Sequence, residues 1–339
     1  MKNIHNDQPF NMAGLFTLSI RLVIGWTYFS AFWRRMVLEN KLIPEEAGYI
    51  GEKFNHFLPN ALGIKPIIEY LVTHPEALQT SMIVFTIIEA IVGLFVMLGL
   101  FSRLMGIGVF SLAMGILLGS GWLGTTCLDE WQIGVLGVAG GFTLFLTGSG
   151  SYSLDHLLMK KNISFTNSKW FKWLGSGSFP IANPKPLVFV GSVLIFGLTL
   201  FTNQYFHGGV FGTLHNKSVK PKIVINNAIL KDNQLQFQVY RTEGADVYGS
   251  FLIGIQLLND KNELIFEMNG QDLSQFQKEK IHNYYVTKVK SGKHSLIIPL
   301  GAKADLNITI PSEKISNTNN YTLKLIDISG AEWTSEIKK

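Results

Sequence analysis

The chain has 339 residues, of which 47% are hydrophobic and only 16% are charged. Soluble domains carry about 25% charged residues, so the composition excludes an ordinary soluble protein. The net charge of +5 does not indicate nucleic-acid binding, because the lysines and arginines are dispersed rather than gathered in runs.

Five apolar segments are long enough to cross a bilayer as helices, which takes about 20 residues each. The first four predict an all-α transmembrane four-helix bundle within residues 1–160. After a cytoplasmic linker, 161–185, the last segment predicts a fifth transmembrane helix within residues 186–204. In chain order the segments are 14–33, 82–101, 104–123, 131–148 and 186–203.

The placement of lysine residues predicts the orientation of the spans. Residues 149–185 contain five lysines and a single acid, Asp155, so the positive-inside rule places this segment in the cytoplasm. With five spans, the N-terminus is then cytoplasmic and the C-terminal domain is extracytoplasmic, or periplasmic. We therefore expect a multi-pass protein of the cytoplasmic (inner) membrane.

From residue 219 onward the sequence alternates between apolar and polar residues. Segments such as 222–225, 234–240 and 321–325 are typical of short strands separated by Asn, Asp and Gly turns. About seven such strands predict an all-β antiparallel sandwich over residues 205–339. The domain has no nucleophile elbow, metal cluster or phosphate loop, which favours a binding, capping or lid role.

Two ionisable residues fall inside the expected spans, Arg21 in the first and Glu89 in the second. Charges in lipid are costly and indicate a functional site. A rise of about 1.5 Å per residue places their Cα atoms roughly 5–10 Å apart in depth, so the arginine can bridge to the carboxylate. Two compatible interpretations stay open. One is an ion pair that locks the bundle, and the other is a polar cavity where Arg21 orients a headgroup and Glu89 handles protons.

A second polar group is expected at the outer ends of the helices. Arg34 and Arg35 end the first span, and His207 and His215 follow the fifth. The arginines are suited to bind an anion, or are ordinary charges flanking a membrane helix. The single cysteine, Cys127, is either an inert small residue or a thiolate favoured by nearby cations. One cysteine cannot ligate an iron–sulfur cluster or attach haem through CxxCH, and we expect no metal or haem.

Several motifs resemble a known membrane family. They are Arg-Leu-Val-Ile-Gly-Trp at 21–26, Ile-Glu-Ala-Ile-Val-Gly at 88–93, Leu-Gly-Leu-Phe-Ser-Arg at 98–103 and Tyr-Ser-Leu-Asp at 152–155. Together they are similar to the DoxD/DoxX-like four-helix family. The rest of the chain has one helix, a His-Gly-Gly…His-Asn stretch at 207–216 and a small β domain, and it resembles DoxA. The whole chain resembles a DoxD–DoxA fusion.

This resemblance implies a thiosulfate:quinone oxidoreductase, which joins two thiosulfates into tetrathionate and passes two electrons to a membrane quinone, ubiquinone or menaquinone. The expected partners are thiosulfate, the quinone and the lipid bilayer, and homo-oligomerisation stays open. The expected catalytic residues are Cys127, Glu89 and Arg21. The expected anion site consists of Arg34, Arg35, His207 and His215, and the expected quinone site of Arg21, Trp26, Glu89 and Trp131.

Two non-enzymatic alternatives remain. The bundle can be a scaffold or assembly subunit whose β domain docks a separate redox protein. It can also be a carrier for small sulfur anions, although the sequence lacks the inverted repeats and broken-helix signals typical of such transporters.

Overall fold

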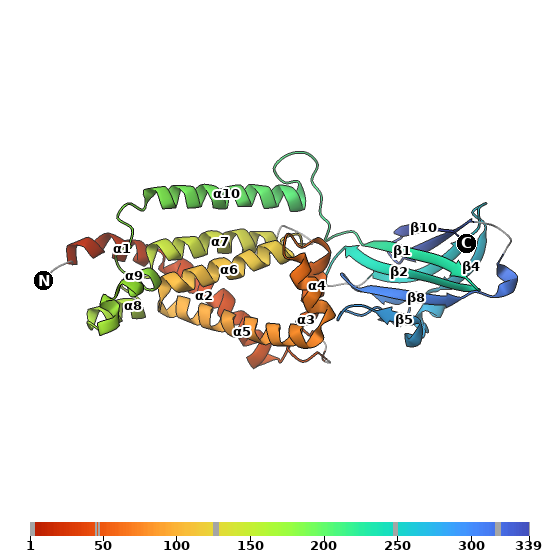
Figure 1. The fold of residues 1–339 in the computed structure, drawn as a ribbon, viewed down its shortest axis with the longest axis horizontal. Helices are drawn as coiled ribbons and strands as arrows, with labels where there is room; N and C mark the ends of the chain where they lie inside the picture. Colours follow the sequence, from red (N-terminus) through yellow and green to blue (C-terminus); the bar gives the residue numbers. More distant parts are fainter. Residues whose placement is uncertain are drawn as a thin grey trace. The chain divides into compact units, whose positions relative to one another are not determined.

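The computed structural model describes residues 4–44, 46, 48–124, 129–246, 250–315 and 320–338. These residues form two compact units. One is helical and draws on residues 1–49, 79–121 and 128–215. The other is mainly β and draws on residues 50–78, 122–127 and 216–339. Figure 1 shows both units, with labels on most of their helices and on some of their strands.

The helical unit is built from long apolar helices with short helices at one end (Figure 1). It begins with α1, Ile4–Phe16, and α2, Leu18–Phe32, which bend by 56° at their junction. A π-helical segment, η1, continues α2 over Trp33–Leu38, so this helix runs further than the expected end at Trp33. The other helices are α5, Pro75–Leu98; α6, Ser102–Ser120; α7, Asp129–Thr147; α8, Leu154–Lys160; α9, Lys169–Leu174; and α10, Lys185–His207.

Three helices of the described chain, α5, α6 and α10, are long and apolar enough to cross a membrane. The bent pair Phe10–Phe16 and Leu18–Leu38 makes a fourth if it is one span. The expected span at 131–148 does form a helix, α7, but polar residues in its first turn keep it outside this set. The chain is a membrane protein, and three or four candidate spans lie among the described residues; that α7 also crosses the membrane stays a prediction.

Glycines allow the long helices to approach each other closely. A Cβ on Gly93 of α5 would lie 2.4 Å from the backbone nitrogen of Phe29 in α2. A Cβ on Gly141 of α7 would lie 2.5 Å from that of Phe110 in α6. Such close approach lets helices pack in lipid, where no hydrophobic force drives them together. In contrast, α10 is exposed along most of its length and buries residues only near its C-terminal end.

The β unit is a sandwich of two antiparallel sheets around one hydrophobic core, which confirms the predicted fold class. Leu235 and Leu306 of one sheet and Leu252 and Leu323 of the other all lie in this core. The first sheet has the order β1, Lys222–Lys231; β2, Gln234–Glu243; β8, Lys303–Thr309; and β5, Ile281–Asn283. The second has β10, Glu332–Lys338; β9, Asn320–Asp327; β3, Ser250–Leu258; β7, Leu296–Ile298; and β6, Lys290–Ser291, with β4, Leu264–Asn269, also paired to β3.

A helical segment from early in the chain belongs to the β unit. It contains α3, Gly51–Phe57, and α4, Lys65–Thr73. Ile68 and Val72 of α4 share a small core with Tyr285, whose hydroxyl donates to Glu69 at 2.9 Å. The β unit is therefore assembled from segments more than 200 residues apart in sequence.

Candidate functional site

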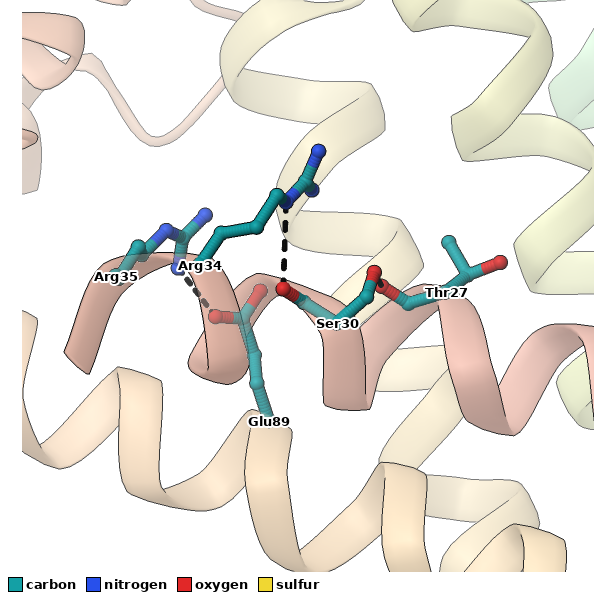
Figure 2. A network of polar contacts seen from close by, with 5 residues as sticks. All are labelled: Thr27, Ser30, Arg34, Arg35 and Glu89. Carbon is teal, nitrogen blue, oxygen red and sulfur yellow. Dashed lines mark hydrogen bonds and ion pairs between the residues drawn. The ribbon is translucent and has the colours of Figure 1, made fainter. Parts of the chain in front are cut away.

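A buried ion pair joins η1 to α5 (Figure 2). Nη1 of Arg35 donates a hydrogen bond to Oε2 of Glu89. Glu89 is only 4% exposed, whereas the side chain of Arg35 is 21% exposed. An ionisable residue inside a candidate span needs a partner, and Arg35 provides it. The pair reaches the molecular surface through its arginine rather than through its carboxylate.

Arg34 lies beside this pair and is not neutralised by it. Its Nε donates to the carbonyl oxygen of Ser30 at 3.3 Å. Figure 2 shows its guanidinium group pointing away from the Glu89 carboxylate. Arg34 is exposed and forms no ion pair within the part of the chain that the structure describes. Arg34, Arg35 and Glu89, which we call the Arg–Glu cluster, therefore carry a net charge of +1.

The helix that carries both arginines also presents a polar face that the sequence analysis passed over. Arg21, Tyr28 and Arg35 recur every seven residues, so they lie near one face of α2 and η1. Tyr28 is 5% exposed and is part of the helical core. The seven-residue spacing is the sequence signal from which Tyr28 could have been predicted to lie on the same face as the two arginines. The π-helical turn around Arg35 is itself a feature frequent at functional sites.

The expected bridge between Arg21 and Glu89 is wrong. Nη1 of Arg21 donates to the carbonyl oxygen of Ser149 at 2.7 Å, and Nη2 donates to that of Tyr152. Arg35 follows Arg21 by fourteen residues, which is roughly 20 Å of helix. Because the bend at Thr17 puts Arg21 in the first turn of α2, the two charged sites lie near opposite ends of that helix.

A fully buried carboxylate organises the end of the bundle near Arg21. Asp155 accepts hydrogen bonds from the backbone nitrogens of Phe101 and Ser102, at 2.8 and 3.0 Å. It also accepts from the hydroxyls of Ser102 and Ser176, both at 2.8 Å. Phe101 has a φ of 48°, a conformation unusual for a residue with a side chain. Asp155 therefore holds the tight turn between α5 and α6.

Arg103 closes the same end of the bundle and is also fully buried. It donates to the carbonyl oxygens of Lys172, Gly175 and Gly177, and its guanidinium lies 5.1 Å from the ring centre of Phe179. Arg21 borders a small void here that has no room for a water molecule, so the void cannot admit a quinone headgroup. These contacts indicate that the buried arginines have a structural role at this end of the bundle.

The remaining predicted residues form their hydrogen bonds with groups outside the Arg–Glu cluster. Nε1 of Trp131 donates to Oγ1 of Thr202 at 3.0 Å and ties α7 to α10. His207 is buried, with Nε2 3.0 Å from the carbonyl oxygen of Gly121, and its own carbonyl accepts from the backbone nitrogen of His215 at 3.0 Å. No hydrogen bond joins these groups to Arg34, Arg35 or Glu89 among the described residues. Cys127 lies outside the described residues.

Trp26 belongs to an aromatic row on α2 that leads toward the cluster. Its ring centre is 6.1 Å from that of Phe29, which is in turn 6.2 Å from that of Trp33. Trp26 is 55% exposed and Trp33 41% exposed. On a membrane helix, these exposed rings offer a flat apolar surface that ends next to Arg34 and Arg35.

Two family matches cover most of the chain. Residues 16–182 match the family described as TQO small subunit DoxD. Residues 206–336 match the family described as TQO small subunit DoxA. The chain is a DoxD–DoxA fusion. The resemblance expected from the motifs is confirmed, and it points to a component of thiosulfate:quinone oxidoreductase, an enzyme complex.

In the DoxD–DoxA fusion, the DoxD part contains the whole Arg–Glu cluster and Asp155 with its hydrogen-bond partners. The DoxA part begins near the end of α10, where His207 stands, and extends into β10. Every predicted site residue except His207 and His215 therefore belongs to the DoxD part.

Proposed function

We propose that the chain oxidises thiosulfate to tetrathionate and transfers the two electrons to a membrane quinone. In the balanced reaction, two thiosulfate dianions lose one electron each and form a sulfur–sulfur bond, while the quinone takes up two electrons and two protons. The observation that carries the proposal is the Arg–Glu cluster. It provides net positive charge and a buried carboxylate at the end of an apolar helix, in a chain made of thiosulfate:quinone oxidoreductase domains.

The positive charge of the cluster suits the substrate. Thiosulfate is a dianion that does not enter lipid, and two of them repel each other as their sulfurs approach. Arg34 has no carboxylate partner among the described residues and serves as the first anion ligand. Arg35, partly exposed, is shared between the anion and Glu89. The guanidinium group of arginine binds oxyanions through two parallel hydrogen bonds. These bonds orient the two thiosulfates, and the positive charge offsets the repulsion between them.

Glu89 and the aromatic row suit the electron acceptor. The row of Trp26, Phe29 and Trp33 offers an apolar surface for a quinone ring within the bilayer. Glu89 passes protons toward the acceptor from its place beside the partly exposed Arg35. Arg21 takes no part in this proposal, because its guanidinium is bound to two carbonyls at the other end of the helix.

The proposal also covers the side of the membrane that the Arg–Glu cluster faces and the part that the thiol of Cys127 takes in the reaction. The Arg–Glu cluster faces the extracytoplasmic side, as the lysine distribution of residues 149–185 predicts. The sulfane sulfur of one thiosulfate attacks either the quinone directly or Cys127 that the quinone has oxidised by taking up two electrons. The second thiosulfate then attacks this bound sulfur, so that tetrathionate forms and the quinol or the Cys127 thiolate leaves. Full activity in Cys127→Ala would leave direct attack on the quinone.

The test is quinone reduction by the purified full chain in lipid nanodiscs, with thiosulfate, sulfite and sulfide compared as donors. We expect reduction with thiosulfate and formation of one tetrathionate per quinone reduced. Reduction by none of the three donors would reject the proposal for the isolated chain. Activity that appears only with a co-purified haem or flavin protein would instead support the scaffold alternative. Thiosulfate uptake into quinone-free liposomes would support the carrier alternative.

A further inference from the structure

The outer face of the first sheet carries a groove that the proposed reaction does not use. The groove has a volume of about 400 Å³ and lies over β2, β8 and the segment that contains β5. Polar side chains dominate its lining, and the aromatic residue Tyr284 stands at its side, 40% exposed. Cavities of about this size hold small ligands and use a few well-placed polar groups for specificity.

Three cross-strand pairs form the floor of this face. β2 and β8 pair antiparallel, and side chains two residues apart point to the same face. Gln234 therefore stands opposite Thr309, Gln236 opposite Asn307, and Gln238 opposite Asp305. The sequences Gln-Leu-Gln-Phe-Gln and Asp-Leu-Asn-Ile-Thr alternate these polar residues with residues of the sandwich core.

The two flanking pairs are closed by their own hydrogen bonds, and the central pair is open. Nε2 of Gln234 donates to Oγ1 of Thr309 at 3.1 Å, and Nε2 of Gln238 donates to Oδ1 of Asp305 at 3.0 Å. Between Gln236 and Asn307 no hydrogen bond forms, although both line the groove. The Oδ1 of Asn307 is buried and has no hydrogen-bond partner among the described residues. A buried acceptor without a donor is costly, so this pair is prepared for a ligand that donates.

Tyr284 is held rigidly at the side of the groove. Its hydroxyl donates to Oδ2 of Asp305 at 2.6 Å, and its ring packs edge-on against His282 with ring centres 5.0 Å apart. Asp305 thereby joins Tyr284 to Gln238. A fixed ring beside free amides offers an apolar face and hydrogen-bonding groups to the same ligand.

The charge of the groove does not favour the sulfur anions of the proposed reaction as its ligands. Glu279 and Asp305 contribute two negative charges to the lining and Lys280 one positive charge. The ammonium of Lys303 lies 5.2 Å from the ring centre of Tyr284. These charges balance, so the groove has no net positive charge that would select a dianion. The groove also lies on the face of the sheet rather than along an edge, so it does not offer the backbone pairing that binds an added peptide strand.

We propose that this groove binds a neutral oligosaccharide. Sugar hydroxyls both donate and accept hydrogen bonds, which matches the exposed amide of Gln236 and the unpaired amide oxygen of Asn307. The apolar face of a sugar ring matches the ring of Tyr284. The inference does not rest on the proposed thiosulfate chemistry, and the two can fail separately.

The test uses the purified full chain in nanodiscs and three uncharged probes, cellohexaose, chitohexaose and maltohexaose. Isothermal titration and saturation-transfer NMR should show that at least one probe binds with a Kd below about 1 mM. Tyr284→Ala should weaken that binding at least tenfold. Tyr70→Ala, which removes another exposed tyrosine of the same unit, should leave it unchanged.

A second variant distinguishes a loss of sugar binding from a loss of folding. Asn307→Leu replaces the unpaired amide with an apolar side chain of similar size, so it should abolish binding without lowering the unfolding temperature. Quinone reduction should stay within twofold of the parent in all three variants. Three results would each overturn the proposal: no binding by any probe at millimolar concentration, equal binding by Tyr284→Ala, or displacement of the sugar by thiosulfate.

Discussion

Arg35 in the π-helical turn after α2 is the ion-pair partner of Glu89 in α5. The close approach of α2 and α5 at Gly93 brings these helices together one turn away from Glu89. The pair is asymmetric, because Glu89 is nearly enclosed while Arg35 reaches the surface. This asymmetry predicts different consequences for the loss of either partner.

Arg35→Met should destabilise the protein more than Glu89→Gln. The first change leaves a buried carboxylate without a partner, which costs about 3 kcal/mol or more. The second leaves an arginine that can turn toward water, and we expect a cost of about 1 kcal/mol. Thermal unfolding of both variants in the same nanodiscs measures the difference. Equal or reversed destabilisation would show that Glu89 is not the enclosed member of the pair. Both variants should lower quinone reduction if the cluster is the reaction site.

Arg34→Gln should lower kcat/KM for thiosulfate at least tenfold with little change in the unfolding temperature. Arg34 is exposed and its only described hydrogen bond is to the carbonyl of Ser30, so the fold does not depend on its charge. An anion ligand of the proposed site would be lost. Lys41→Gln is the matched control, because Lys41 is a half-exposed cation that pairs with Glu39 on the surface. If both variants lose activity equally, general surface charge rather than Arg34 attracts the substrate.

Asp155→Asn should reduce stability by about 3 kcal/mol or more. The fully buried Asp155 accepts four hydrogen bonds from Phe101, Ser102 and Ser176, and an asparagine amide would face donors with a donor of its own. Thermal unfolding of the full chain tests this, with Glu39→Gln as an exposed control. An unfolding temperature equal to that of the parent would contradict the structural role assigned to Asp155.

The stability of the β unit should fall as the pH is lowered from 6.5 toward 4. Burial, the larger cause, and the nearby charge of Lys53 together lower the pKa of His56 to about 4. In this window the unfolded chain binds a proton at His56 that the folded chain does not, so acid favours unfolding, by about 3 kcal/mol in total.

The measurement is the free energy of unfolding of the full chain across this pH range. His56→Gln should flatten the dependence, whereas His74→Gln, at an exposed histidine of the same unit, should leave it as in the parent. An unchanged slope in His56→Gln would assign the acid sensitivity to other groups.

The sequence alone predicted the two kinds of structure and the family. Charge-free segments predicted membrane helices, because backbone groups in lipid must be satisfied within a helix. Period-two alternation after residue 219 predicted the antiparallel sandwich, because such strands bury one face. Both predictions depend on patterns within one segment of the chain. Such patterns can be recognised without knowing which other segments pack against it. Arg34 and Arg35 lie near one end of the first helix, as predicted, and their role as an anion site stays a prediction.

Only the tertiary structure decided which side chains meet. The expected depths in the membrane predicted a contact between Arg21 and Glu89. The sequence did not predict the bend at Thr17 or the π-helical extension to Leu38, and both affect where the residues of the first helix lie along α5. Arg35 therefore met Glu89, and Arg21 met two carbonyls after α7. The packing of residues 50–78 with the β unit had no sequence signal either. Composition and periodicity determine which solvent a segment prefers, whereas pairing depends on helix length, bends and close approach between segments far apart in the chain.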